Sequence, residues 1–261
     1  MPEGHTIHRA ARDQRKMLAG QKLAVSSPQG RFMDGAALLD GETCTDVDAY
    51  GKHLLYQFSN GLSLHIHLGL FGKFKTQKVP AREPVGAVRV RMESAGHVVD
   101  INGPNTCELL NPDERAALVG RIGPDVLRKD ADPVVAFARI SKSKAAIGLL
   151  LMDQSVLAGI GNIYRTEILW RCQVSPHTPG KAIDRSTFDL LWADSVSLLE
   201  IGVENNAIIT VEGVTKSKSR YGERVNIFNK PHCPRCHGEI TRIDMATRRA
   251  FFCETCQQHP G

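Results

Sequence analysis

The sequence predicts a multidomain α+β protein with a β-rich N-terminal region, a helical middle and a small cysteine-rich hairpin at the end. Three observations support this. Apolar residues alternate with a period of two between residues 53 and 101, and they follow a helical period between 147 and 203. Two CxxC pairs then occupy residues 233–256. The chain of 261 residues, 42% hydrophobic and 23% charged, is ordinary globular material and long enough for two domains.

An amphipathic helix is expected over residues 6–19, with Thr6 as its N-cap and Gly20 just beyond its end. Its apolar face is formed by residues at helical spacing, namely Ile7, Ala10, Ala11, Gln14 and Leu18.

Two β-hairpins are expected next. The segments HLLYQF and LSLHIHL flank Asn60-Gly61, a strong hairpin turn signal, and His65 and His67 alternate with the leucines of the second strand. The alternating segment 88–92 has a suitable partner strand in 97–101. Together with the N-terminal helix, these hairpins predict a β-rich domain of about 110 residues.

The pattern becomes helical after a polar segment, 121–133, that is typical of a linker. A stripe of leucine and isoleucine begins at Ile147, Asn162 is the expected N-cap of the next helix, and another helix is expected over 187–203. Residues 212–231 are polar and basic, and we expect them to be mobile.

The two CxxC pairs are the strongest motif in the chain. CPRC at 233–236 and CETC at 253–256 are separated by a segment with the length of a β-hairpin, so four thiolates can surround one ion. His232 and His237 are rival ligands by position, but four cysteines already complete a tetrahedral site. We therefore expect one structural zinc ion bound by Cys233, Cys236, Cys253 and Cys256. The isolated Cys44, Cys107 and Cys172 are expected to be small buried hydrophobes.

Charge and composition limit the partners. The net charge is +5, and residues 205–261 carry nine Lys/Arg against five Asp/Glu, which favours a polyanionic partner. No apolar run long enough to span a membrane and no secretory signal is present, so a reducing cytoplasm is expected.

Several single residues permit more than one interpretation. Lys52, between a glycine turn and a strand, is either a solvated edge residue or functional. His67, on the polar face of its strand, is either structural or functional. Leu70 and Phe71 lie between glycines, where they either fold into the core or form an exposed apolar wedge.

Two further signals point to anion binding. Arg248 and Arg249, expected at the turn of the cysteine-rich hairpin, are either solvated or suited to bidentate phosphate contact. The short glycine turn before Asn162 exposes backbone N–H groups that favour an anion, although many such helix pairs only pack.

The chain begins Met-Pro-Glu, and removal of Met1 would leave Pro2 with a free secondary amine. An α-amino group titrates near pH 7.7–8.0, and the positive end of the following helix dipole depresses its pKa further. Such an amine can attack an aldehyde carbon of a sugar to form an iminium ion, with Glu3 as the neighbouring acid or base. Many chains also begin Met-Pro without this chemistry.

Taken together, these segments resemble the formamidopyrimidine-DNA glycosylase/endonuclease VIII family of base-excision-repair enzymes. The resemblance covers the whole chain and rests on PEG, GKHLL, HLGLFG, IGPDVL, LLMDQSVLAGIGNIYRTEILW and the CxxC-x16-CxxC finger, in the family's order and spacing. It implies an N-terminal catalytic β-sandwich domain (2–118), a helix–two-turn–helix DNA-binding domain (126–220) and a four-cysteine zinc-finger β-hairpin (221–261).

The resemblance also implies roles in DNA glycosylase and AP lyase chemistry. Pro2 matches the nucleophile that forms a Schiff base, Glu3 the residue that moves protons at the ribose, and Lys52 a catalytic lysine near the lesion phosphate. Damaged DNA is the implied partner, bound by a monomer in a bacterial-type cytosol.

The phosphate-binding positions of the family are matched by His67, Asn162 and Arg248, the last also counted with the catalytic set. Arg249 is the alternative to Arg248 if the hairpin register shifts. Leu70 and Phe71 match part of the family's wedge, whose first member is glycine here. A weak wedge favours single-stranded, bubble or abasic substrates.

His5 and Thr6 stand where many members have proline and glutamate. The loop NGPNTCELL lacks the arginines and phenylalanine of purine-directed members, which favours the endonuclease VIII branch and oxidised pyrimidines. The alternative is an inactive member that only binds damaged DNA. A zinc-ribbon interaction protein would leave the N-terminal motifs unexplained.

Overall fold

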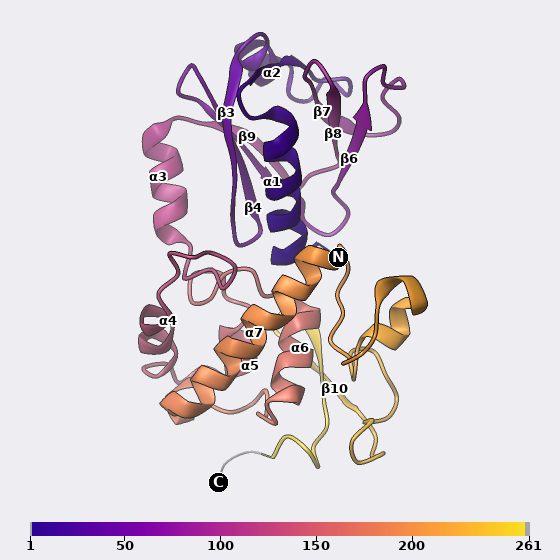
Figure 1. Ribbon diagram of the computed structural model, residues 1–261. Coiled ribbons are helices and arrows are strands. Elements are labelled where there is room, and N and C mark those ends of the chain that lie inside the picture. Colours follow the sequence, from indigo (N-terminus) through magenta and orange to yellow (C-terminus); the bar gives the residue numbers. More distant parts are fainter. Residues whose placement is uncertain (1, 259–261) are drawn as a thin grey trace. The chain divides into compact units, whose positions relative to one another are not determined.

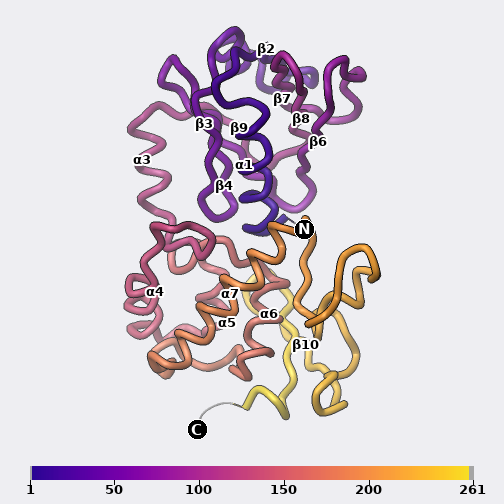
Figure 2. Tube along the Cα trace, in the orientation of Figure 1, coloured from indigo at the N-terminus to yellow at the C-terminus, as the bar shows by residue number. Residues whose placement is uncertain are grey.

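The structure is a computed structural model that describes residues 2–258, arranged as two compact units (Figures 1 and 2). The first unit ends at Arg121 and the second begins at Ile122.

The first unit is a sandwich of two antiparallel sheets. The larger sheet has the order β1-β3-β4-β5-β9 and the smaller one β2-β7-β8-β6. The larger sheet consists of β1 (Gln21–Lys22), β3 (Thr43–Tyr50), β4 (His53–Phe58), β5 (Ser63–His67) and β9 (Thr106–Leu110). The smaller consists of β2 (Ala24–Ser26), β6 (Lys73–Lys78), β7 (Val88–Glu93) and β8 (His97–Asn102). Both expected hairpins, β4–β5 and β7–β8, are confirmed.

Three helices complete this unit: α1 (Gly4–Leu18), α2 (Met33–Leu39) and α3 (Pro112–Arg121). The expected buried face of α1 is confirmed, and it packs on β3 and β4. The expected N-cap was wrong, because the Thr6 backbone N–H already donates to the Glu3 carbonyl and the helix begins two residues earlier, at Gly4. Glu3 is the N-cap residue.

One apolar core fills the space between the two sheets. It includes Leu54 and Tyr56 of β4 on one side and Val99 and Ile101 of β8 on the other, all fully buried. Both sheets and α1 contribute to this cluster, so apolar burial joins them into one core.

The second unit contains helices followed by a hairpin. Its elements are α4 (Pro133–Ile140), α5 (Ile147–Leu150), α6 (Asn162–Arg171), α7 (Arg185–Asn205), β10 (Thr241–Met245) and β11 (Arg248–Phe252), with 3₁₀ turns at Gly180–Ala182, Lys216–Lys218 and Tyr221–Arg224. The expected helix over 187–203 is confirmed within α7, where the Asp184 side chain caps the first turn by accepting from the Thr187 N–H at 2.7 Å.

Part of the segment expected to be a linker belongs to this unit's core. Val126 is buried in the helical cluster, and Asp125 forms a bridge with Ala158. The hairpin of β10 and β11, yellow in Figure 2, packs beside α6. A small separate apolar cluster lies beneath it.

Candidate active site and metal centre

The first two predicted catalytic residues lie at the start of α1. Pro2 is half-buried, and Glu3 is fully buried at the N-cap position. A carboxylate in this place is stabilised by the positive end of the helix dipole. The start of α1 lies at the same end of the unit as the turn between β3 and β4 (Figure 1).

His5 and Thr6 lie in the first turn of α1. Burial lowers the pKa of His5 to about 4, so its imidazole is neutral at physiological pH. Its Nε2 lies 3.2 Å from the Thr6 hydroxyl. This turn therefore carries a neutral histidine and a hydroxyl rather than a second carboxylate beside Glu3.

Lys52 and His67 lie at the same end of the larger sheet. Gly51, with a φ of 58°, makes the tight turn between β3 and β4 that Lys52 completes, and His53 then pairs with His67. Burial lowers the pKa of His67, and the neighbouring His65 and Lys52 lower it further. Lysine and histidine side chains thus converge where an anion would be stabilised.

The loop after His67 exposes its two apolar side chains. Leu70 is 41% exposed and Phe71 is 89% exposed, so neither folds into the core. Gly69 is required before them because its φ is +67° and a Cβ would approach the Asn105 Cβ to 2.8 Å. A side chain at position 69 is therefore excluded by the backbone conformation and by this crowding.

Asn162 is the first residue of α6 rather than its N-cap, which is Gly161, so the expected cap was wrong. The Asn162 side chain is buried and donates from Nδ2 to the Arg249 carbonyl at 3.0 Å. The Arg165 guanidinium donates to Asn162 Oδ1 and, at 3.5 Å, to the same carbonyl. The structure therefore brings Asn162 together with the start of β11.

Arg248 and Arg249 were expected at the hairpin turn, but the structure places them at the start of its second strand, β11. Ala246, with a φ of 54°, is in the turn, and Arg248 pairs with Met245 across it. Arg248 is half-buried and Arg249 is exposed. Consecutive residues on a strand point to opposite faces, so only one of the two guanidinium groups can serve a given surface.

The four cysteines of the CxxC pairs form one group whose Sγ atoms all lie within 4.8 Å of one another. Cys233 Sγ is 3.8 Å from Cys256 Sγ, and Cys236 Sγ is 3.4 Å from Cys253 Sγ. A tetrahedral zinc with Zn–S bonds of about 2.3 Å requires S···S distances of about 3.8 Å. The donor set and its spacing therefore fit zinc, and neither His232 nor His237 belongs to the group.

Helix α6 supports this centre from outside. The Trp170 indole Nε1 donates to Cys233 Sγ at 3.3 Å, and the Arg235 guanidinium lies 4.4 Å from the Trp170 ring centroid. An N–H donor to a ligating sulfur fixes its position and stabilises its negative charge.

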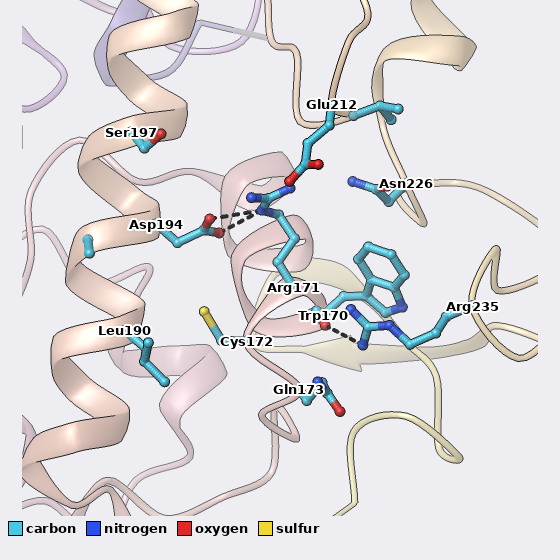
Figure 3. Close-up of a pocket in the computed structure, with 12 residues that line it drawn as sticks. Trp170, Arg171, Cys172, Gln173, Leu190, Asp194, Ser197, Glu212, Asn226 and Arg235 are labelled. Carbon is cyan, nitrogen blue, oxygen red and sulfur yellow. Dashed lines mark hydrogen bonds and ion pairs between the residues drawn. The ribbon is translucent and has the colours of Figure 1, made fainter.

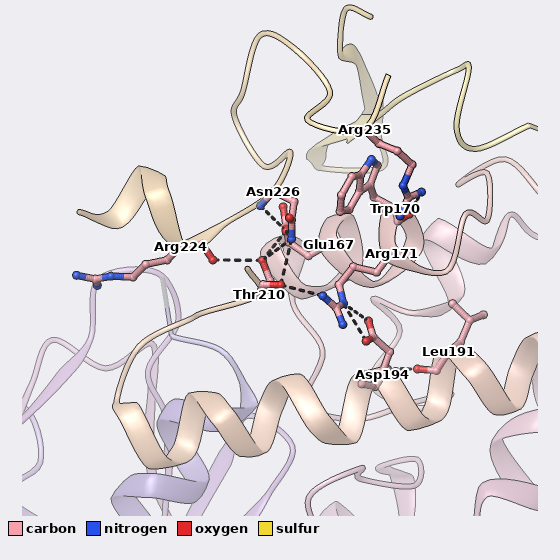
Figure 4. Close-up of polar contacts among 10 residues, drawn as sticks. Glu167, Trp170, Arg171, Leu191, Asp194, Thr210, Arg224, Asn226 and Arg235 are labelled. Atoms are coloured by element: carbon pink, nitrogen blue, oxygen red, sulfur yellow. Dashed lines mark hydrogen bonds and ion pairs between the residues drawn. The ribbon is translucent and has the colours of Figure 1, made fainter. Parts of the chain in front are cut away.

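Glu167 of α6 is a structural anchor that sequence reasoning missed. Its fully buried carboxylate accepts hydrogen bonds from three backbone N–H groups, at Asn226, Ile227 and Phe228, and from the Thr210 hydroxyl (Figure 4). These partners lie on both sides of the basic segment 212–224. A charged residue inside the otherwise apolar run EILW was the only available signal.

A hollow of about 800 Å³ lies between the end of α6, α7 and the cysteine-rich hairpin (Figure 3). Its two cations already have protein partners. Arg171 is paired with Asp194 at 2.9 Å, and Arg235 contacts the carbonyl and ring of Trp170. None of the residues predicted from sequence to be functional lines this hollow.

Comparison with known proteins identifies the family. Residues 1–108 match the formamidopyrimidine-DNA glycosylase N-terminal domain, and residues 122–213 match the H2TH domain of the same enzymes. Endonuclease 8 1 of Mycobacterium bovis is 41% identical over 98% of this chain and 100% of its own length. The chain belongs to the formamidopyrimidine-DNA glycosylase/endonuclease VIII family.

Other members of this family agree with that assignment. Endonuclease 8 of Salmonella typhi is 30% identical over 99% of this chain and all of its own length. The formamidopyrimidine-DNA glycosylase of Lactococcus lactis, solved non-covalently bound to DNA containing an AP site, has a TM-score of 0.81 at 25% identity, covering 98% of this chain and all of that one.

Family membership makes this chain a DNA glycosylase of base-excision repair with AP lyase activity. Among residues 2–258, no helix has both the length and the apolar character needed to cross a membrane.

Proposed function

We propose that this protein removes oxidised bases, chiefly pyrimidines, from damaged DNA and then cleaves the strand by β/δ-elimination through a Schiff base at Pro2. The observation that carries the proposal is the placement of Pro2 and the fully buried Glu3 at the start of α1, in a chain whose relatives are named endonuclease 8. The loop 102–110, which lacks the arginines of purine-directed members, supports the preference for pyrimidines.

In the proposed reaction, the Pro2 nitrogen attacks C1′ of the damaged nucleotide and the base leaves with its bonding electrons. Glu3 donates a proton to the ribose ring oxygen, so the ring opens. The resulting iminium keeps its positive charge without a proton, so it accepts the electron pair of the C2′–H bond when that proton is removed. The enamine formed in this way expels the 3′-phosphate, which leaves with the electrons of the C3′–O bond. Water then releases Pro2.

The DNA contacts belong to two sets. Lys52 and His67 bind phosphates near the lesion, while Leu70 and Phe71 enter the base stack. Their exposure and shared sheet end support this assignment.

In the second unit, Arg248 binds phosphate beside the first turn of α6, with Arg249 as its exposed neighbour. Asn162 contributes by fixing the hairpin on α6, and its amide has a second N–H for a phosphate.

One structural zinc ion would be held by the four cysteines and would supply no reactivity, because a closed four-thiolate site has no position for substrate. It would fix the hairpin that carries Arg248. The protein would act as a monomer in the cytosol, where the nucleoid DNA lies.

An excision panel tests the proposal. Defined oxidised pyrimidines and purines would be placed in duplex, bubble and single-stranded DNA, with an abasic duplex as the reference substrate. We expect nicking of the abasic duplex and faster release of pyrimidine lesions. Binding without nicking would indicate the inactive alternative, and faster release of purine lesions would refute the pyrimidine preference.

A further inference from the structure

Three polar side chains form a continuous hydrogen-bonded chain across the larger sheet. Glu108 Oε1 lies 2.9 Å from His65 Nδ1, and His65 Nε2 lies 2.8 Å from His53 Nδ1. The strand register places Glu108 of β9 opposite His65 of β5. It places His53 of β4 opposite His67, two residues along β5 from His65 and on the same face of the sheet. His65 is buried, whereas the Glu108 side chain is 52% exposed.

This chain ends beside the proposed phosphate contacts. His53 follows Lys52 directly and pairs with His67, and the two imidazole centroids are 5.2 Å apart. Among the residues that the structure describes, no protein group is hydrogen-bonded to His53 Nε2. That nitrogen is therefore the open end of the chain.

The charged and titratable groups around this hydrogen-bonded chain come from the turn before β4 and from β5, β9 and α3. Lys52 precedes β4, His67 is on β5, Glu108 is on β9, and Arg121 ends α3. Glu114 of α3 also lines the hollow of about 340 Å³ that Glu108 and Arg121 border. The Glu108 carboxylate thus contacts His65. Lys52 and Arg121 instead disfavour a positive charge on His53.

His53 itself stays neutral. Burial lowers its pKa to about 3, and the neighbouring His65, His67, Lys52 and Arg121 lower it further. A neutral imidazole has one N–H donor and one acceptor nitrogen, so its tautomer is set by the partner at Nδ1. When His65 is neutral, its Nδ1–H is directed to Glu108, its Nε2 accepts from His53 Nδ1–H, and His53 Nε2 is an acceptor.

We propose that Glu108, His65 and His53 form a proton relay that makes His53 a hydrogen-bond donor to a DNA phosphate at Lys52 and His67, with uptake of one proton. The inference rests on the proposed DNA contact of Lys52 and His67. His53 binds phosphate directly, and His65 and Glu108 act as positioning residues.

The proton balance is simple. A solvent proton binds His53 Nε2, and the proton on His53 Nδ1 moves to His65 Nε2. His65 then becomes an imidazolium that donates to Glu108 and to His53 Nδ1, and His53 remains neutral with its proton at Nε2. The one added charge lies on His65, against the carboxylate that accepts from its other nitrogen.

The sign of the pH effect follows from linkage. Since the DNA-bound form holds one more proton than the free form, binding strengthens as the pH falls. Over the pH range in which the relay is unprotonated in the free protein and protonated in the complex, the logarithm of the DNA association constant should change by about −1 per pH unit.

The first test uses the free protein and does not depend on DNA. Nitrogen-15 NMR of the imidazole rings distinguishes the two tautomers. We expect His53 to carry its proton on Nδ1 at high pH and to change to Nε2 as the pH falls. A His53 tautomer that stays the same over the whole pH range would overturn the relay.

The second test measures proton uptake when the protein binds a duplex with a tetrahydrofuran abasic analogue. Calorimetry in buffers of different ionisation enthalpy should give about one proton for the wild type. Glu108→Gln keeps a neutral acceptor for His65 but removes the charge, so uptake should fall towards zero. Matched controls are Glu93→Gln, on the exposed end of β7, and His97→Gln on β8, which should both retain uptake.

Two results would contradict the relay. Wild-type binding without proton uptake is one. Uptake that persists in Glu108→Gln and disappears in His67→Gln is the other, since His67 would then take the proton itself. If the duplex does not bind at all, the proposed function fails, while the tautomer measurement on the free protein still tests the hydrogen-bonded chain.

Discussion

Helices α1 and α6 are held in the fold in different ways. The 15 residues of α1 bury one apolar face on a sheet and expose Arg15 and Lys16 on the other face. In α6, nine of the ten residues, Asn162 to Trp170, are buried. A helix buried on all sides must satisfy its polar side chains inside the protein. The partners of Asn162, Glu167 and Trp170 come from chain segments 43 to 87 residues further on.

Compared with α1, α6 depends more on contacts with distant segments, including the cysteine-rich hairpin. Asn162 binds β11, Glu167 binds residues 226–228, and Trp170 binds Cys233. The cysteine-rich hairpin has a small apolar cluster of its own, so the surroundings of α6 depend on the metal centre. The surroundings of α1 do not.

The largest expected effect is loss of the hairpin. Cys253→Ser, or removal of the metal by a chelator, should unfold residues 233–256 and expose the Trp170 side of α6, because structural zinc in such fingers contributes on the order of 10 kcal/mol. The β-sandwich around α1 should remain folded. Circular dichroism and Trp170 fluorescence would detect the change, and DNA affinity and nicking should fall together.

Cys44→Ser is the matched control, because Cys44 is a buried thiol of the first unit and far in sequence from the metal centre. Burial raises the pKa of Cys44 to about 12, so its thiol stays neutral and binds no metal. The control should keep the hairpin. A chelated protein that still nicks abasic DNA at full rate would contradict the dependence of α6 on the metal.

A smaller effect is expected when the anchor of α6 is weakened. Glu167→Gln replaces a carboxylate that accepts several hydrogen bonds by an amide with a single acceptor oxygen, and should reduce the free energy of unfolding by about 2–4 kcal/mol. Denaturant unfolding would measure this. Glu200→Gln on the exposed face of α7 should change it by less than about 0.5 kcal/mol. Equal effects of both substitutions would refute the anchoring role.

The smallest effect concerns single phosphate contacts, one at each unit. Lys52→Ala and Arg248→Ala should each reduce the slope of log K against log salt by roughly one, since each releases about one counterion. Arg31→Ala, exposed beside α2, should leave the slope unchanged. Unchanged slopes in both test variants would remove Lys52 and Arg248 from the interface.

The features that could be predicted from the sequence are those with a local hydrophobic period or a local residue spacing. The buried face of α1, the Asn60-Gly61 hairpin and the four-cysteine group depend on side chains a few residues apart or on a recognisable motif. The acceptor of Asn162, the donors to Glu167, and the contact of His53 with His65 depend on how distant segments pack. Helix boundaries also shifted, because backbone hydrogen bonds extended α1 to Gly4 and placed Asn162 inside α6.

Borohydride trapping tests most directly whether Pro2 is the nucleophile. Borohydride should reduce the iminium formed on abasic DNA to a stable protein–DNA adduct, and peptide mapping should locate that adduct at Pro2 of a chain without Met1. An uncleavable N-terminal tag converts the amine to an amide and should abolish both trapping and nicking, while the same tag at the C-terminus should leave both intact. If the N-terminally blocked protein still forms the adduct, a lysine is the nucleophile, Lys52 being the first to test, and the central claim is wrong.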